Sequence, residues 1–386
     1  MRILQIHNTY RQAGGEDSVV ATERDLLESH GNEVRLFGAD NSVINGPIKK
    51  LSTALRVTYN VEVRRRLEGE LKSWRPDVVH VHNFFPLLTP SVFDACRNSK
   101  VPVVMTLHNF RLLCPGALLW RHGEVCELCL KSRPLPGILH RCYRDSFLGS
   151  LSVARMVDYH LRRRTWATKV DRYIVMTEFS RQKFISAGWE PGRISVKPHS
   201  CRPSTVFAPE NTERQGALFA GRLSLEKGVS TLLAAWRHIP HPLRLAGDGY
   251  MRGEINKENN RNIHMLGWLS SQELSKWMSQ VVCLVVPSEC YETFGMVILE
   301  AYAHGIPVIA PRIGALEELV EEGKTGFLFT PGDSVELAAK VNYLLERPDD
   351  AKRMGENARS VYFRDFTPER NYTQLVHIYQ EMLNGE

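Results

Sequence analysis

Short runs of apolar, mostly β-branched residues alternate along the chain with longer stretches whose apolar residues recur every three or four positions. The short runs are apolar throughout, which is typical of strands in a sheet covered on both faces. This alternation predicts parallel sheets joined by crossover helices. In the first half we expect strands at residues 3–7, 34–37, 78–81, 103–107 and 173–176. The helices expected between them cover residues 18–29, 91–97, 148–168 and 180–187.

A second series of the same kind begins near residue 216. Its expected strands are residues 217–220, 243–246, 263–266, 283–286, 307–309 and 326–329. Its expected helices are residues 229–238, 271–280, 295–303 and 335–345, with a last helix at 368–383. The chain is therefore expected to contain two doubly wound α/β units.

Residues 196–213, between the two series, are rich in Pro, Ser and charge, which predicts a linker. We expect one domain at 1–197, with an insertion at 110–145, and a second at 205–365. Residues 366–386 are expected to form a helix that packs back toward the first domain. Ligands of doubly wound sheets bind at the carboxyl ends of the strands, so the cleft between two such domains is the default site.

Composition narrows the class of protein without naming it. The 386 residues suit two domains, and the net charge of +6 with a pI near 8.8 suits anionic partners such as phosphates or a membrane surface. This charge is too small to indicate nucleic acid by itself. The first residues do not resemble a signal peptide, and no run of about 18 apolar residues is present. We expect a cytoplasmic protein whose eight cysteines are reduced.

The most informative polar residues follow the expected strand 283–286. Glu292 lies just before an expected helix, and Glu300 lies about two turns along it. The free amides at the start of that helix, near Phe294 and Gly295, suit an anion or the oxygens of a sugar. Two carboxylates at this separation suit the two ends of a hydroxyl-rich ligand.

Two further segments follow other expected strands. Arg222 and Lys227 lie after strand 217–220 and offer a planar fork and a point charge for phosphate oxygens. Gly14 and Gly15 follow the first strand, where backbone amides are able to reach a phosphate. Each feature alone has an ordinary explanation, as surface charge, helix-dipole partner or turn. Their combination is what favours a sugar-nucleotide site.

Together these motifs resemble family 4 glycosyltransferases, which have the GT-B fold: two facing Rossmann-like α/β domains with a deep interdomain cleft. The resemblance covers nearly the whole chain. It rests on Gly14-Gly15, Gly221-Arg222, Lys227-Gly228, Ala246-Gly-Asp-Gly249, Gly267-Trp268, Glu292 with Glu300, and Gly305-Ile-Pro-Val308. It implies a retaining hexosyltransferase that needs no metal for catalysis, with acceptor and donor bound by the N-terminal and C-terminal domains respectively.

The resemblance also implies roles for single residues. Arg222 and Lys227 would hold the donor diphosphate, Glu300 the ribose hydroxyls and Glu292 the hydroxyls of the transferred sugar. His108 would line the reaction centre, and it joins Glu292, Arg222 and Lys227 as a candidate catalytic residue. The other expected donor-binding residues are Gly14, Gly15, Gly249, Leu269, Thr293, Phe294 and Gly295. Asn109 and the segment Val196–Ser200 depart from the family pattern near the expected acceptor side.

The insertion at 110–145 contains a Cys-x2-Cys pair, Cys126 and Cys129, flanked by Cys114 and Cys142. Four thiolates at these spacings would complete a tetrahedral zinc site. The alternative is that the thiols are reduced packing residues. A structural zinc is therefore one interpretation of the insertion.

Basic residues gather at 160–183 and at Arg64–Arg66. Such a face suits an anionic membrane, since polybasic segments gain about 1 kcal/mol of binding free energy per charge near one. The alternative is a helix face that is exposed only to solvent. The resemblance implies that the acceptor is a saccharide or a lipid-linked glycan. It also implies a role in surface polysaccharide or glycoconjugate biosynthesis, with the enzyme bound peripherally to the inner face of the membrane.

Two other functions compete with glycosyl transfer. A nucleotide-sugar epimerase has the same fold and would be recognised by epimer formation without an acceptor. A zinc-knuckle nucleic-acid-binding protein would use Cys126 and Cys129 with the basic clusters, but it leaves Glu292 and Glu300 without a role, and we expect no nucleic-acid partner.

Overall fold

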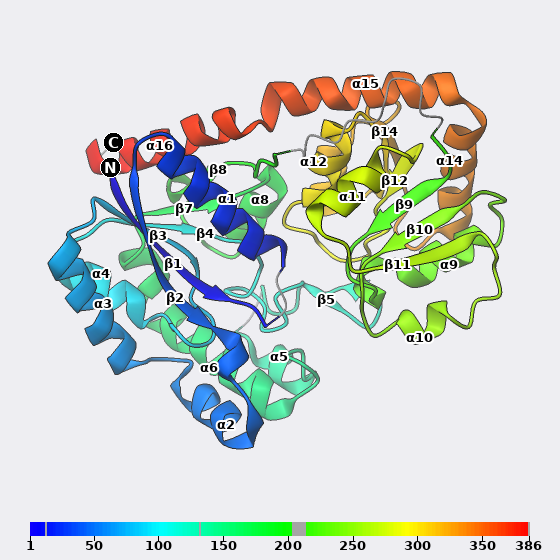
Figure 1. The fold of residues 1–386 in the computed structure, drawn as a ribbon. Coiled ribbons are helices and arrows are strands. Elements are labelled where there is room, and N and C mark those ends of the chain that lie inside the picture. The colour runs from blue at the N-terminus through cyan, green and yellow to red at the C-terminus, as the bar shows by residue number, and fades with distance from the viewer. Residues whose placement is uncertain (12–13, 131–132, 203–213, 385–386) are drawn as a thin grey trace. The chain divides into compact units, whose positions relative to one another are not determined.

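The computed structural model describes residues 1–11, 14–130, 133–202 and 214–384 of the chain (Figure 1). The chain forms two compact units. The first comprises Met1–Leu119, Cys126–Pro198 and Asn371–Glu386, and the second comprises Trp120–Val125 and His199–Arg370.

The first unit is built on a six-stranded parallel sheet in the order β2-β1-β3-β4-β7-β8. Every residue of β3 is buried, because helices cover both faces of the sheet. The strands are β1 (Arg2–Thr9), β2 (Glu33–Asp40), β3 (Val78–Asn83), β4 (Val103–Thr106), β7 (Arg172–Val175) and β8 (Ile194–Val196). A separate antiparallel pair, which belongs to the second unit, is formed by β5 (Trp120–Arg121) and β6 (Glu124–Val125).

The helices around this sheet include the last one of the chain. Leu375, Ile378 and Tyr379 of α16 are buried in one apolar cluster with Ile3 and Val78 of the central strands. The helices are α1 (Gly15–Ser29), α2 (Gly46–Arg56), α3 (Val61–Trp74), α4 (Ser91–Asn98), α5 (Leu135–Leu139), α6 (Phe147–Arg162), α7 (Thr165–Thr168), α8 (Glu178–Ser186) and α16 (Pro368–Asn384).

The second unit repeats the plan with a parallel sheet in the order β11-β10-β9-β12-β13-β14. Its strands are β9 (Ala217–Ala220), β10 (Leu243–Ala246), β11 (Ile263–Gly267), β12 (Cys283–Val285), β13 (Val308–Pro311) and β14 (Gly326–Phe329). Its helices are α9 (Val229–Trp236), α10 (Arg252–Ile255), α11 (Ser271–Met278), α12 (Met296–Ala303), α13 (Gly314–Leu319), α14 (Ser334–Glu346) and α15 (Pro348–Asp365).

The expected strands are all present, but two expectations about other segments are wrong. The helix predicted at 148–168 is two helices, α6 and α7, because Arg164 has a left-handed backbone (φ 53°). The linker does not begin at residue 196, since Ile194–Val196 form the edge strand β8. Most of the rest of that segment, residues 203–213, lies outside the described residues. The sequence does not predict the helices α2, α3, α5, α10, α13 and α15. No helix among the described residues is long and apolar enough to cross a membrane.

In each sheet, successive strands are added first on one side of the starting strand and then on the other, so the strand order reverses once. The reversal lies between β1 and β3 in the first unit and between β9 and β12 in the second. Loops that follow the two strands at such a point diverge from each other, and the crevice between them is the usual ligand site of a doubly wound sheet.

Candidate active site

In the second unit, two of the predicted motifs meet at the point where the strand order reverses. Lys227 belongs to the loop after β9, and Glu292 to the loop after β12; these strands are parallel neighbours, with Cys283 paired to Ala217. The Lys227 ammonium group forms an ion pair with Oε1 of Glu292. The Ser288 hydroxyl donates a hydrogen bond to the same oxygen at 2.7 Å. Two residues that the resemblance assigned to different parts of the donor are therefore each other's partners here.

The electrostatics of this site favour a charged Lys227. Burial alone would lower the pKa of Lys227, but the Glu292 carboxylate beside it raises the pKa above its usual range. Arg222 lies in the same loop and is exposed, with its guanidinium nitrogen Nη1 3.8 Å from Oε1 of the buried Glu226. The loop after β9 therefore presents two cations, one exposed and one half-buried.

Glycines allow these loops to approach one another. Gly228 has a left-handed backbone (φ 68°), and a Cβ there would lie 1.8 Å from the carbonyl oxygen of Pro287. A Cβ at Gly249, which we expected to bind the donor, would lie 2.2 Å from the carbonyl oxygen of Leu223. Packing of the backbone is thus sufficient reason for glycine at both positions.

Helix α12 begins at Met296, shortly after Glu292. Its N-cap is Gly295, which offers no side chain to cap the first amides, and Phe294 before it is buried against the rings of His199 and Phe366. Glu300 lies further along the helix, where burial raises its pKa to about 7. Thr293 lies in the same loop as Phe294, and Leu269 follows the end of β11; both are half-buried. The expected donor-binding residues of this unit therefore all lie at or after the carboxyl ends of β9, β10, β11 and β12.

In the first unit, His108 follows β4 and contacts a histidine that we did not anticipate. Its Nε2 lies 3.1 Å from Nδ1 of His82, within hydrogen-bonding distance, and the two rings stack at 5.4 Å. Both histidines line a small pocket together with Asn83, Phe85 and Arg111. This pocket lies beside the point where the first sheet reverses its strand order.

A buried polar cluster lies behind His82. Oε1 of Glu23, on α1, lies 3.1 Å from Nε2 of His82 and 3.1 Å from Nδ1 of His80. The Lys197 ammonium lies 3.7 Å from the other Glu23 oxygen. Burial would raise the pKa of Glu23, but the neighbouring His80 and His82 hold it well below its usual range. Burial, together with repulsion from His80, lowers the pKa of His82 to about 4, so His82 is neutral at pH 7.

Among the residues that the structure describes, Glu23, His80 and His82 are the one group of three or more side chains whose ligand atoms lie within 4.8 Å of one another. Both His80 nitrogens already have hydrogen-bond partners, the hydroxyl groups of Tyr379 at 2.7 Å and Thr106 at 2.8 Å. The group therefore fits a hydrogen-bond network better than a metal site.

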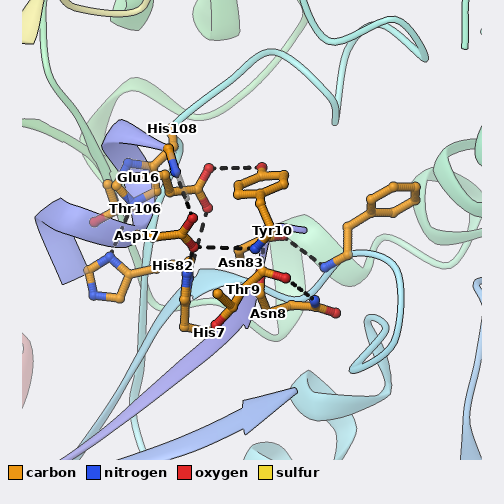
Figure 2. A network of polar contacts seen from close by, with 12 residues as sticks. His7, Asn8, Thr9, Tyr10, Glu16, Asp17, His82, Asn83, Thr106 and His108 are labelled. Atoms are coloured by element: carbon orange, nitrogen blue, oxygen red, sulfur yellow. Dashed lines mark hydrogen bonds and ion pairs between the residues drawn. The ribbon is translucent and has the colours of Figure 1, made fainter. Parts of the chain in front are cut away.

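Two acidic residues, Glu16 and Asp17, follow the glycine pair of the first unit, and Figure 2 shows their contacts with Tyr10 and His7. Nε2 of His7 lies 2.7 Å from an Asp17 oxygen, and the Tyr10 hydroxyl donates to Glu16 at 3.0 Å. Burial raises the pKa of Glu16 to about 8. A Cβ added at Gly14 or Gly15 would meet no atom within 4 Å, so the backbone there is open to an approaching molecule.

Sequence reasoning missed this histidine-rich region. The one signal was the alternation Val79-His80-Val81-His82 in an otherwise apolar strand, which places both histidines on one face. The acidic partner Glu23 lies on the apolar helix face of α1, where it resembles an ordinary helical residue in the sequence.

All four cysteines of the insertion are free thiols, and they do not form a second group of ligand atoms within 4.8 Å of one another among the described residues. Burial, and then the neighbouring Cys114, Cys142 and Cys126, raise the pKa of Cys129 to about 12. A zinc site here stays a prediction.

Two models of known protein families match the chain. The model described as "Glycosyltransferase Family 4" matches residues 2–201, and the model described as "Glycosyl transferases group 1" matches residues 206–361. The chain belongs to glycosyltransferase family 4. Both units are thus covered, and the enzyme is a glycosyltransferase.

Relatives of this glycosyltransferase act on several sugars. A glycogen synthase of Mycobacterium tuberculosis is 27% identical over 339 residues, which cover 84% of this chain and 73% of the relative. The sulfoquinovosyl transferase SQD2 of Arabidopsis thaliana is 33% identical over 364 residues, 90% of this chain and 64% of that protein.

Solved structures establish the fold as GT-B. The Anabaena protein HepE in complex with UDP matches with a TM-score of 0.69 at 20% identity, over 99% of this chain and 100% of that one. Sucrose-phosphate synthase of Thermosynechococcus elongatus matches with a TM-score of 0.73 at 19% identity, over 100% of both chains. The predicted fold class, an α/β protein with two Rossmann-like domains, is confirmed.

Proposed function

We propose that this glycosyltransferase is a retaining enzyme that transfers a hexosyl group from a nucleoside-diphosphate sugar to a saccharide or lipid-linked acceptor. The observation that carries the proposal is the meeting of Lys227 and Glu292 at the ends of β9 and β12. A cation for phosphate and a carboxylate for sugar hydroxyls lie side by side, next to the uncapped start of α12. The surface-polysaccharide or glycoconjugate pathway remains part of the proposal.

Binding of the donor exchanges partners in this site. The diphosphate takes Lys227 and Arg222, and Glu292 is then able to accept hydrogen bonds from the sugar. Glu300, about one turn along α12, accepts from the ribose hydroxyls, and the amides near Gly295 face the distal phosphate. Ionic hydrogen bonds of this kind are worth about 1.5–3 kcal/mol each.

The chemistry follows from charge. Departure of the nucleoside diphosphate builds negative charge on the distal phosphate while the sugar carbon becomes cationic. Lys227, Arg222 and the helix amides stabilise that negative charge, and preorganised donors of this kind supply most of the catalysis in many enzymes. The configuration is retained when the acceptor attacks the face that the phosphate leaves, with a phosphate oxygen of the donor taking the acceptor proton.

The pocket of the first unit is the proposed acceptor side. His108 lines it, and its hydrogen-bonding contact with His82 orients its ring. Gly14 and Gly15 leave room for a ligand beside the first sheet. Neither feature selects the acceptor.

Relatives support the choice of donor class. HepE has been crystallised in complex with UDP and in complex with UDP-glucose, and these complexes favour a nucleoside-diphosphate sugar for this chain too. The donor base and sugar are left open by the variety of the relatives.

Product analysis tests the proposal. The enzyme is incubated with α-linked nucleoside-diphosphate sugars and with saccharide or lipid-linked acceptors, and the new anomeric proton is read by NMR. An α-linked product supports the proposal, and a β-linked product contradicts retention. Formation of an epimeric sugar nucleotide without any acceptor would instead identify the epimerase.

A further inference from the structure

Helix α2 of the first unit exposes its apolar side chains to solvent. It contains no buried residue, although apolar residues recur on one face at helical spacing. Ile48, Leu51 and Leu55 are 83%, 59% and 63% exposed. Surface helices normally bury such a stripe, so an apolar stripe that faces water indicates a surface that is covered by another molecule.

The neighbouring helices continue this exposed apolar character. Phe147 and Leu148 at the start of α6 are half to two-thirds exposed, and Leu139 of α5 is 77% exposed. Helix α6 packs against α2 and α5, and the three helices lie side by side at the lower end of the first unit (Figure 1). Arg155 of α6 donates to the carbonyl oxygen of Leu55 at 2.8 Å, which ties α2 to this group. We call the exposed residues of these helices the α2–α5–α6 surface.

Positive charge is concentrated in the same segments. Residues 42–60 and 133–164 contain ten Lys or Arg residues and two Asp residues, a net charge of +8, which exceeds the +6 of the whole chain. Lys49 and Lys50 flank the apolar stripe of α2, and within the described part of the chain neither makes an ion pair, nor does Arg141. Apolar residues on one face with lysines beside them are typical of helices that lie in the interface of an anionic bilayer.

The basic residues that the sequence suggested for this role are distributed differently. Those of residues 160–183 are spread over α6, the segments on either side of α7, β7 and α8, and so do not form one helix face. Lys169 is paired with Asp94, and Lys183 with Glu127. Lys49 and Lys50 of α2 are better suited to a partner, because within the described residues no carboxylate pairs with them, whereas Arg56 of the same helix lies 4.0 Å from Glu62.

We propose that the α2–α5–α6 surface binds an anionic phospholipid membrane, with Ile48, Leu51 and Leu55 entering the interface and Lys49 and Lys50 contacting headgroup phosphates. A second copy of the chain is a poor occupant, since a symmetric contact would bring together two copies of a surface whose surrounding segments, residues 42–60 and 133–164, carry a net charge of +8. This proposal does not depend on the donor or on the reaction.

Vesicle flotation tests the proposal with the full chain. The wild-type protein is mixed with phosphatidylcholine vesicles, with or without phosphatidylglycerol, and is expected to float only with the anionic vesicles. Two variants are compared, Ile48→Ser/Leu51→Ser/Leu55→Ser and Lys49→Glu/Lys50→Glu, and both are expected to lose flotation. About 0.5 M salt should weaken wild-type binding, because it shortens the screening length to a few ångströms.

Matched controls lie in the second unit. Val335 is 70% exposed and apolar, and Lys257 and Lys352 are exposed lysines. Val335→Ser and Lys257→Glu/Lys352→Glu are expected to float as the wild type does. Thermal unfolding of each variant at the wild-type temperature shows that the loss is not caused by misfolding.

Any of three results would overturn the membrane proposal. It fails if the wild-type protein does not float with anionic vesicles, or if both variants of α2 float as well as the controls. It also fails if light scattering detects a wild-type dimer that the triple variant dissociates, because the surface would then be an interface between copies of this chain.

Discussion

Lys227 and Glu292, which are 65 residues apart in the sequence, form an ion pair at the ends of two neighbouring parallel strands. The pair keeps a cation and a carboxylate together at the reversal of strand order, where a ligand of this fold is expected. When no ligand is bound, each charge still has a partner. The protein therefore avoids the large free-energy cost of burying a single charge. Donor binding then requires only an exchange of partners.

Substitution of the two residues should separate their roles. Lys227→Met is expected to weaken binding of both the nucleoside diphosphate and the sugar donor by about 10- to 100-fold, the equivalent of one lost ionic hydrogen bond. Glu292→Gln is expected to weaken only the sugar-bearing donor, and free nucleoside diphosphate should bind at least as tightly as to the wild type because Lys227 is released. Calorimetric titration measures both. Equal losses for the two ligands in Glu292→Gln would exclude the assigned role of Glu292.

The affinity for the donor should depend on pH through Glu300. Burial raises the pKa of this carboxyl to about 7, so it is largely protonated at pH 6. Only the ionised form accepts from two ribose hydroxyls, so affinity should fall by up to about tenfold per pH unit below pH 7. This pH dependence should disappear in Glu300→Gln. Any pH dependence that remains in the variant comes from titration of the donor phosphates. A pH dependence that is the same in both proteins would remove Glu300 from the donor site.

His82 is expected to act as a positioning residue for His108. Loss of the 3.1 Å contact in His82→Gln should misplace the His108 ring and lower kcat by about 10- to 100-fold, with the donor KM unchanged. His377→Gln, an exposed histidine of α16, is the matched control and should keep wild-type kcat. A purely structural role for His82 would instead lower the thermal unfolding temperature and leave kcat unchanged at temperatures where the protein is folded.

On one of the two interpretations of the cysteine insertion, it holds one zinc ion per chain. Burial and neighbouring thiols oppose ionisation of Cys129, and a bound cation is what would allow these thiols to become thiolates. Elemental analysis of protein purified without chelators is expected to find zinc in the wild type and in Cys201→Ala, but not in Cys126→Ser/Cys129→Ser. Absence of zinc from the wild-type protein would favour reduced packing thiols.

The fold was predictable because parallel strands buried on both faces leave an unambiguous apolar signal, as in Val78–Val81 and Leu243–Ala246. Helix α2 left no such signal, since its apolar face is not turned toward the core. Strand β8 is not predicted, and the predicted linker includes its last residue, Val196, because the strand is only three residues long and ends beside Lys197 and Pro198.

The candidate site was predictable in part for a related reason. Arg222, Lys227, Glu292 and Glu300 follow strands closely, so local sequence placed them at a sheet edge. The contact of His82 with His108 depends on β3 and β4 being neighbours, and Glu23 joins them from a distant helix. Such partners arise from tertiary pairing, which the order of residues along the chain does not reveal.

The most direct test of the donor site is a thermal-shift screen against uridine-, guanosine-, adenosine- and thymidine-diphosphate sugars, with Glu300→Ala beside the wild type. We predict that one nucleotide class raises the unfolding temperature of the wild type and that the rise is lost in Glu300→Ala, as expected for about 1.5–3 kcal/mol of donor binding. A folded wild-type protein that no donor stabilises, or an equal rise in Glu300→Ala, would contradict a donor site at the ends of β9 and β12.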